Sequence, residues 1–171
     1  MTELTFTADT QDVAADSSVD DFELGTLTMY DLPSLAALYM AAYGQEYTPD
    51  NFWGATDEVR LYFDGALGDV KDDGFIGAWQ DGTLVGAIFS AVDSPFESVP
   101  GGPFVLDLMV DPDYRRRGIA TALVGELGRR IEDWGYDSVT LRLDVRQMPE
   151  AFNLYSRMGF TPLSEEVPDR A

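Results

Sequence analysis

The sequence predicts a single domain of mixed α/β structure over residues 22–171, with a β-sheet flanked by about four helices. The pair Asp81-Gly82 lies between two apolar segments, which is a strong β-hairpin signal. Residues 104–110 are nearly all apolar, as in a strand that is buried on both faces. Residues 118–134 carry apolar side chains at helical spacing. A chain of 171 residues is long enough for one hydrophobic core, and it shows no internal repeat.

The first part of the chain is predicted to hold a tail, one strand and two helices. Residues 1–21 contain six acidic residues and no basic one, so we expect a solvated, flexible tail. Residues 22–29 form a weak strand pattern. A first helix is expected to begin after Asp31, a good N-cap, and to end at Gly44. A second helix is expected from Asp57 to about Leu67.

The remainder of the chain predicts further strands separated by turns and helices. Strands are expected at 75–79, 84–91, 104–110 and 139–145. A loop rich in proline and glycine, residues 93–103, leads into the third of these strands. After the fourth strand, Pro149 suits the first turn of a last helix, and a short strand begins at Phe160.

Two amino acids are missing, which excludes several kinds of site. The chain contains no cysteine, so disulfides, thiolate nucleophiles and iron–sulfur clusters are excluded. It contains no histidine, which excludes triads that need an imidazole and the common zinc enzymes, and we expect no metal. No apolar run approaches the ~20 residues of a membrane helix, and the N-terminus has no secretory pattern. We therefore expect a cytoplasmic protein with no membrane partner.

The charge of the chain is strongly negative and unevenly distributed. Its net charge is −20, so we expect no nucleic-acid partner. Lysine occurs once, at Lys71, and this acidic, lysine-poor composition resembles that of proteins from extreme halophiles, in which molar salt screens self-repulsion. Residues 115–157, by contrast, hold eight arginines and six acidic residues. Such a segment indicates an anionic ligand, although surface salt bridges alone would also account for it.

The clearest functional motif runs from Val110 to Val124, with the sequence VDPDYRRRGIATALV. It joins the buried strand to the N-terminus of the long helix, where unpaired N–H groups and the helix dipole favour an anion. Gly118 allows the backbone to approach that anion closely, and the preceding arginines add positive charge. A phosphate or pyrophosphate is the expected occupant. The alternative is a plain strand–turn–helix with solvated arginines.

Two segments resemble one known family. The pattern Arg115-x-x-Gly118-x-Ala120, after this strand, resembles the pyrophosphate-binding motif of the GNAT superfamily of N-acetyltransferases. The segment AFNLYSRMGF at 151–160 resembles the last helix and the following strand of the same family. The resemblance covers about residues 22–165.

The resemblance implies a fold, an activity and a set of binding residues. The sheet would be mostly antiparallel and would splay open between strands 104–110 and 139–145 to hold acetyl-CoA. The acetyl group would pass directly to a primary amine in a ternary complex, with no covalent enzyme intermediate. Backbone groups of Leu108, Met109 and Val110 would pair with the pantetheine arm. The pyrophosphate would be held by the loop and the helix start, at Arg115, Arg116, Arg117, Gly118, Ile119, Ala120 and Thr121.

Three residues are candidates for acid–base catalysis. Tyr155 matches the position where the family often places its general acid, although it is also an aromatic residue at core-facing spacing. Without histidine or cysteine, the base must be a carboxylate or an ordered water. Asp144 lies in a stretch that resembles one in ribosomal-protein N-terminal acetyltransferases, but it could simply pair with Arg142 or Arg146. Asp107 interrupts an apolar strand, where burial would raise its pKa, but it could instead take structural hydrogen bonds.

One position departs from the family pattern. Seven residues before Tyr155, where the family often has an asparagine that contacts the cofactor, this chain has Met148. Methionine cannot donate that hydrogen bond. A non-catalytic acyl-CoA-binding module in regulation or assembly therefore stays open as an alternative function, and an arginine cluster that binds nucleic acid is a third.

The acceptor and the oligomeric state are less well defined. The family holds its acceptor with the first two helices and the loops before the central strand. In this chain these segments offer aromatic and acidic residues, at Tyr43, Glu46, Tyr47, Phe52, Trp53 and the loop 95–103. That mixture suits a cationic amine, either a small molecule or a peptide N-terminus. The protein would be a monomer or a homodimer.

Overall fold

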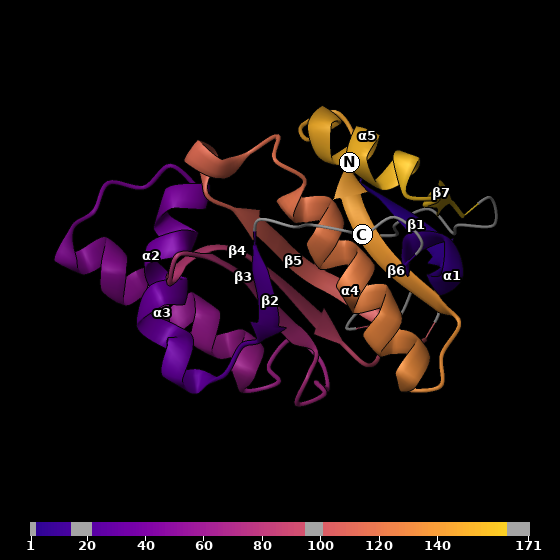
Figure 1. The fold of residues 1–171 in the computed structure, drawn as a ribbon, viewed down its shortest axis with the longest axis horizontal. Helices are drawn as coiled ribbons and strands as arrows, with labels where there is room; N and C mark the ends of the chain where they lie inside the picture. The colour runs from indigo at the N-terminus through magenta and orange to yellow at the C-terminus, as the bar shows by residue number, and fades with distance from the viewer. Residues whose placement is uncertain (1–2, 15–21, 95–100, 164–171) are drawn as a thin grey trace.

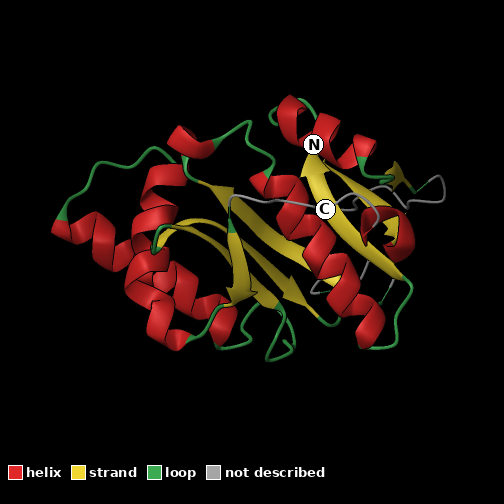
Figure 2. Ribbon diagram, in the orientation of Figure 1, coloured by secondary structure: helices red, strands yellow, loops and turns green. Residues whose placement is uncertain are grey.

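The computed structural model describes residues 3–14, 22–94 and 101–163, in which seven strands and five α-helices form (Figures 1 and 2). The strands are β1 (Glu3–Asp9), β2 (Glu23–Thr26), β3 (Phe75–Gln80), β4 (Thr83–Ala91), β5 (Phe104–Val110), β6 (Ser138–Asp144) and β7 (Thr161–Pro162). The helices are α1 (Thr10–Ala14), α2 (Leu32–Ala42), α3 (Pro49–Phe63), α4 (Ile119–Asp133) and α5 (Pro149–Arg157).

All seven strands belong to one sheet, in the order β2-β3-β4-β5-β6-β1-β7. Every neighbouring pair is antiparallel except β5 and β6, which are parallel. These two strands pair only at Phe104 and Thr140, where the N–H of Thr140 donates to the Pro103 carbonyl at 3.0 Å. Beyond that point they diverge (Figure 1). The predicted mostly antiparallel sheet, open between these two strands, is confirmed.

Helices cover both faces of the sheet because both faces are apolar. Ile76 and Ile88 lie in one core with Leu123 of α4. The neighbouring Phe75 and Phe89 point to the opposite face, into a second core with residues of α2 and α3. Figure 1 shows α4 across one face, with α2 and α3 gathered beside β2–β4.

The predicted N-terminal tail is wrong for residues 3–14. Residues 3–9 form β1, which lies between β6 and β7, and α1 follows directly. Phe6 and Val13 are buried, whereas the acidic residues described in this segment remain at least partly exposed. The paired residues of β1 and β6 are 129 to 141 positions apart in the sequence, so local composition does not indicate this pairing. Residues 15–21 of the predicted tail lie outside the described residues.

The two N-terminal helices start differently from the prediction. Helix α3 begins at Pro49, not at Asp57, because the Thr48 hydroxyl accepts the N–H of Asn51 at 3.1 Å. The Thr48-Pro49 pair is the sequence signal that predicts this start. Asp31 does precede α2, but its carboxylate accepts the N–H of Thr28 at 2.9 Å and does not cap the helix.

Most of the other predicted ends lie within one or two residues of the observed ones, but β2 ends at Thr26, three residues early, and α3 ends at Phe63 instead of near Leu67. The hairpin turn has φ of 50° at Asp81 and 82° at Gly82, as a two-residue turn between twisted strands requires. Part of the predicted loop, residues 95–100, lies outside the described residues. Among the residues that are described, no helix is both long and apolar enough to cross a bilayer. Nor do three or more acidic side chains in that part of the chain cluster as a metal site requires.

Gly86 on β4 allows α4 to pack closely on the sheet. A Cβ at this position would lie 2.7 Å from Cγ2 of Ile119 and 3.1 Å from Cδ1 of Leu123. We expect Gly86→Ala to lower the free energy of unfolding by about 1–3 kcal/mol, through overpacking. Gly54→Ala in α3 is the matched control, since its Cβ would meet nothing within 4 Å, and it should stabilise the helix by up to about 1 kcal/mol. Denaturant unfolding of both variants checks this, and equal effects would contradict the contact.

Candidate functional site

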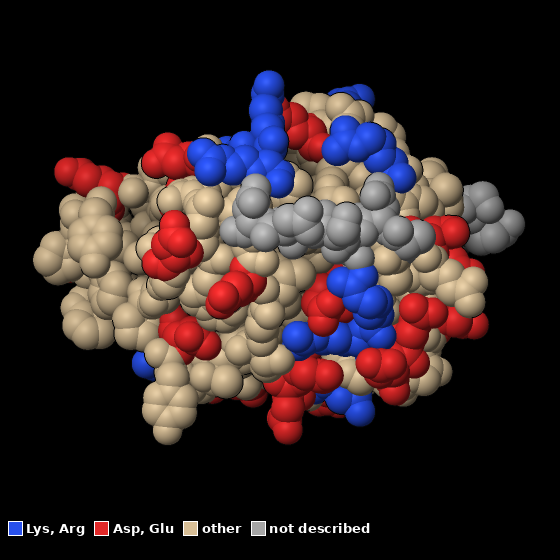
Figure 3. All heavy atoms as spheres, viewed as in Figure 1, with Lys and Arg blue, Asp and Glu red and all other residues tan. Residues whose placement is uncertain are grey.

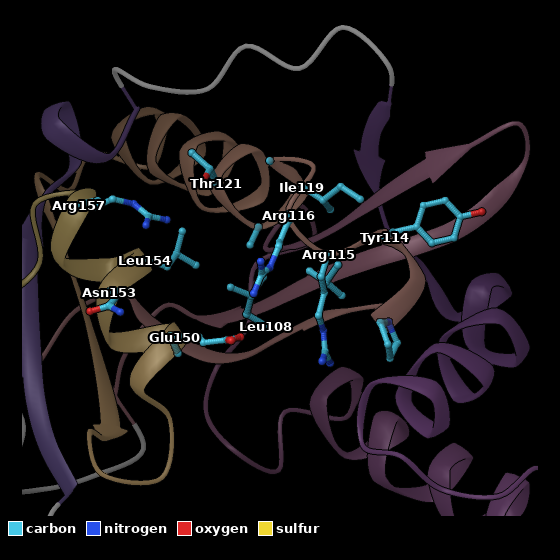
Figure 4. Close-up of a pocket in the computed structure, with 15 residues that line it drawn as sticks. Leu108, Tyr114, Arg115, Arg116, Ile119, Thr121, Glu150, Asn153, Leu154 and Arg157 are labelled. Atoms are coloured by element: carbon cyan, nitrogen blue, oxygen red, sulfur yellow. The ribbon is translucent and has the colours of Figure 1, made fainter.

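A cavity of about 830 Å³ lies between the end of β5, the start of α4 and one face of α5. It therefore lies beside the end of β5 that has diverged from β6, and the helix that follows β6 forms its other wall. Figure 4 shows side chains reaching it from three separate elements, among them Leu108 from β5, Thr121 from α4 and Leu154 from α5.

Strand β5 presents backbone groups to this cavity. The N–H of Asp111 donates to the Val85 carbonyl on β4 at 2.9 Å. Backbone groups alternate between the two sides of a strand, so those of Leu108 and Val110 face the opening instead of β4. Both residues line the cavity. Met109, predicted to bind with them, does not line it: its backbone turns toward β4 and its side chain is buried in the core.

Helix α4 points its N-terminus into the cavity. The first intrahelical hydrogen bond runs from Ala122 N–H to the Gly118 carbonyl at 3.0 Å, so the N–H groups of Ile119, Ala120 and Thr121 have no partner within the helix. Gly118, the N-cap, has no side chain to cap them and has φ of 83°. An added Cβ there would meet nothing within 4 Å, so this backbone angle, not a lack of space, requires glycine.

Arginines surround the same end of the cavity. Arg115, Arg116 and Arg157 line it, and Figure 4 shows the last two on opposite sides of the opening. Arg117 does not line it, and its guanidinium lies over the Tyr114 ring, 5.0 Å from the ring centre. On the face drawn in Figure 3, basic side chains gather along the upper edge, over α5 and the loop before α4. Guanidinium groups beside free N–H groups form a donor set that fits a pyrophosphate.

Helix α5 contributes residues that the sequence analysis missed. Glu150, Asn153, Leu154 and Arg157 all line the cavity. Their spacing of three or four places them on one helix face, and this periodicity is the signal that could have found them. Glu150 adds a carboxylate among the arginines.

Asp107 lies on β5, where the strand is distorted by a bulge, and contacts both N-terminal helices. Tyr43 Oη donates to its two carboxylate oxygens at 3.0 and 2.9 Å, and Tyr62 Oη donates to Oδ2 at 3.0 Å. The N–H of Leu108 donates to Oδ1 at 2.8 Å. Burial raises the pKa of Asp107, and these hydrogen bonds oppose the increase. Burial and the Asp107 charge raise the pKa of both phenols, which therefore stay protonated.

Tyr155 and Asp107 lie close enough to influence each other, whereas Asp144 is engaged elsewhere. Tyr155 on α5 is buried and packs edge-on against Phe160, with ring centres 5.3 Å apart. Burial, followed by the charge of Asp107, raises its pKa. Asp144 accepts the N–H groups of Arg146 at 3.1 Å and Gln147 at 3.3 Å, so its carboxylate closes the turn between β6 and α5.

Comparison with protein families identifies the fold. Residues 32–160 match the family described as Acetyltransferase (GNAT) family, which is most of the chain. The chain belongs to the GNAT acetyltransferase family. No curated protein sequence matches it.

Solved GNAT-like structures share the fold at low sequence identity. A Pyrococcus horikoshii protein is 20% identical with a TM-score of 0.70, over 85% of this chain and 92% of its own. The PaiA N-acetyltransferase of Thermoplasma acidophilum, in complex with coenzyme A, is 22% identical with a TM-score of 0.59, over 83% and 91%. The ribosomal-protein-S18-alanine N-acetyltransferase of Escherichia coli is 15% identical with a TM-score of 0.60, over 88% and 99%. In three further matches this chain spans 57%, 52% and 48% of the other protein.

Met148, which departs from the GNAT pattern, occupies the N-cap of α5. It is half exposed and makes no side-chain cap. We expect Met148→Asn to raise the free energy of unfolding by about 1 kcal/mol, because an asparagine side chain can accept an N–H of the first turn. Met29→Asn, at a similarly exposed methionine that is not an α-helix N-cap, is the control. Chemical denaturation of both variants tests this, and no gain at Met148 would show that this helix start needs no cap.

Proposed function

We propose that this protein transfers an acetyl group from acetyl-CoA to a primary amine. The observation that carries the proposal is the cavity beside β5, which combines an open strand edge, an uncapped helix N-terminus and arginines. Membership of an acetyltransferase family supports it. So does the position of Tyr155 and Asp107, which are sequence neighbours of the cavity residues Leu154 and Leu108.

The residues present fit acetyl-CoA as a substrate. The carbonyl of Leu108, whose N–H donates to Asp107, and the backbone groups of Val110 would pair with the extended pantetheine arm as an added strand does. The N–H groups of Ile119, Ala120 and Thr121, with the nearby arginines, would hold the pyrophosphate. When bound, acetyl-CoA supplies a thioester carbonyl that an amine can attack.

The roles of acid and base follow from the two buried groups. Asp107 receives the proton that the amine loses, and the raised pKa of its carboxyl makes it a stronger base than an ordinary aspartate. Tyr155 donates a proton to the departing thiolate, and its raised pKa keeps it protonated until then. Asp144 stabilises the turn before α5 and takes no proton in this scheme.

The acceptor is a cationic amine, small or a peptide N-terminus. Asp107 supplies negative charge beside the rings of Tyr39 and Tyr43, whose centres are 4.6 Å apart. A second aromatic group, Tyr47 with Phe52 and Trp53, lies at the start of α3. Aromatic faces and a carboxylate together attract ammonium groups.

Calorimetric titration of acetyl-CoA in molar potassium chloride, with free CoA as control, tests binding. Mass spectrometry after incubation with alkylamines, diamines and peptides with free N-termini tests transfer. We expect one-site binding and acetylation of at least one amine. Binding without any transfer would favour the non-catalytic acyl-CoA-binding module. No binding by the folded protein would overturn the proposal.

Two neighbouring arginines provide a further test of acetyl-CoA binding. Arg116 lines the cavity and Arg117 does not. We expect Arg116→Gln to weaken acetyl-CoA binding about tenfold or more, as the loss of a charge-assisted hydrogen bond does. Arg117→Gln should change the Kd much less, and equal losses would contradict the placement of the cavity.

We also propose that the protein works in concentrated salt. Its net charge of −20 on 171 residues produces self-repulsion. At 1 M salt the Debye length is about 3 Å, so this repulsion is largely screened. We therefore expect its Tm to rise steadily as potassium chloride increases from about 0.1 M to about 2 M. A Tm that stays flat or falls across this range would contradict the proposal.

A further inference from the structure

Three donors hold the carboxylate of Asp107, and the hydroxyl of Tyr43 spans both of its oxygens. An ionised carboxylate offers about four lone-pair positions on its two oxygens. Oδ1 accepts the N–H of Leu108, Oδ2 accepts Tyr62 Oη, and the one hydrogen of Tyr43 Oη is shared between both oxygens. An amine that approaches from the side of Tyr43 therefore meets this hydroxyl before it meets the carboxylate.

Of the three donors, only Tyr43 is an exposed hydroxyl that can pass a proton on. The Leu108 donor is backbone within β5, and the Tyr62 ring is stacked on the fully buried Phe89, with ring centres 4.6 Å apart. Tyr43 is the C-cap of α2 and is 52% exposed. Among the described residues no group donates to its oxygen, so that oxygen is free to accept an N–H.

We propose that the hydroxyl of Tyr43 relays the proton of the acceptor amine to Asp107. This inference rests on the proposed acetyl transfer. The ammonium ion first loses one proton to solvent, which leaves the neutral amine as the nucleophile. As its nitrogen bonds to the acetyl carbon, an N–H bond breaks and a new O–H bond forms on Tyr43. At the same time the original Tyr43 O–H bond breaks and the hydrogen becomes the carboxylic acid proton of Asp107. The hydroxyl of Tyr43 ends as it began, and Asp107 returns its proton to solvent by the reverse route.

The neighbouring titratable groups are consistent with this path. The groups that face Asp107 are Tyr39 and Tyr43 on α2, Tyr62 on α3 and Tyr155 on α5. All four are phenols whose raised pKa keeps them protonated. Asp107 is therefore the group in this cluster that can accept the proton of the amine and keep it. Tyr62 acts as a positioning residue, because it orients the carboxylate without reaching the substrate.

Tyr43→Phe and Tyr62→Phe form a matched pair, since each removes one hydroxyl from the same carboxylate. We expect Tyr43→Phe to lower kcat about 10²-fold with the best acceptor from the amine panel, as loss of a proton-transfer group does. Tyr62→Phe should lower kcat less. It should also move the acidic limb of the kcat/KM profile to higher pH, because a hydrogen bond that favours the ionised carboxylate is lost.

A double-mutant cycle with Asp107→Asn decides whether the two groups act in sequence. In a relay, adding Tyr43→Phe to Asp107→Asn has no further effect on kcat. Equal losses in the two phenylalanine variants, or a full additional loss in the double variant, would overturn the relay. Calorimetric binding of acetyl-CoA confirms that each variant is folded.

Failure of the relay is distinguishable from failure of the proposed function. A wild-type protein that acetylates no amine overturns both. An active wild type with a nearly inactive Asp107→Asn variant, but with equal phenylalanine variants, overturns only the relay.

Discussion

Replacing Asp107 with asparagine is expected to lower kcat by about 10²- to 10⁴-fold, the usual contribution of a general base. The change keeps the size of the side chain and removes its ability to take a proton. Steady-state kinetics with acetyl-CoA and the best acceptor amine measure the effect. Acetyl-CoA binding should be nearly unchanged, because Asp107 does not line the cavity.

Asp144→Asn is the control for this prediction. The asparagine oxygen can still accept the N–H groups of Arg146 and Gln147, so we expect little change in kcat. A large loss of kcat in Asp144→Asn, together with an active Asp107→Asn variant, would mean that Asp144 and not Asp107 is the general base.

The same assignment predicts a pH dependence. Burial raises the pKa of Asp107 above the ordinary aspartate value, and only the ionised form accepts a proton. The kcat/KM of the wild type should therefore be full above this pKa and fall as the pH decreases through it. In Asp107→Asn this limb should disappear.

Replacing Tyr155 with phenylalanine is expected to lower kcat by about 10²-fold, as removal of a general acid does. The aromatic ring and its packing on Phe160 remain, so the free energy of unfolding should change little. Because the pKa of Tyr155 is raised, its ionisation should produce no loss of wild-type activity up to about pH 10, the pKa of an ordinary tyrosine.

Tyr136→Phe is the matched control, because Tyr136 lies in the turn after α4 and is partly exposed. We expect wild-type kinetics from it. If Tyr155→Phe were equally active, Tyr155 would be only a core aromatic and the departing thiolate would need another proton donor.

Much of the fold could be predicted because its signals are local. The Asp81-Gly82 turn, the apolar strand at 104–110 and the amphipathic α4 each depend on residues within a few positions of one another. The N-terminal strand could not be predicted in this way. Its pairing with β6 joins residues that are 129 to 141 positions apart, and its acidic composition favours a tail.

The residues of the candidate site also fall into two groups, those predicted from local motifs and those that depend on the fold. Short motifs in the sequence were enough to predict the family, the strand–turn–helix loop with Gly118 and Tyr155 as a candidate acid, because each motif spans only a few neighbouring residues. Only the tertiary structure distinguished the environments of Asp107 and Asp144. Tyr43 and Tyr62 reach Asp107 from 64 and 45 positions away, and no local pattern records which side chains the folded helices bring to a strand. Met109 and Arg117 do not line the cavity for local reasons that the family motif did not show: a strand alternates its sides, and the guanidinium of Arg117 lies over the ring of Tyr114, three positions earlier.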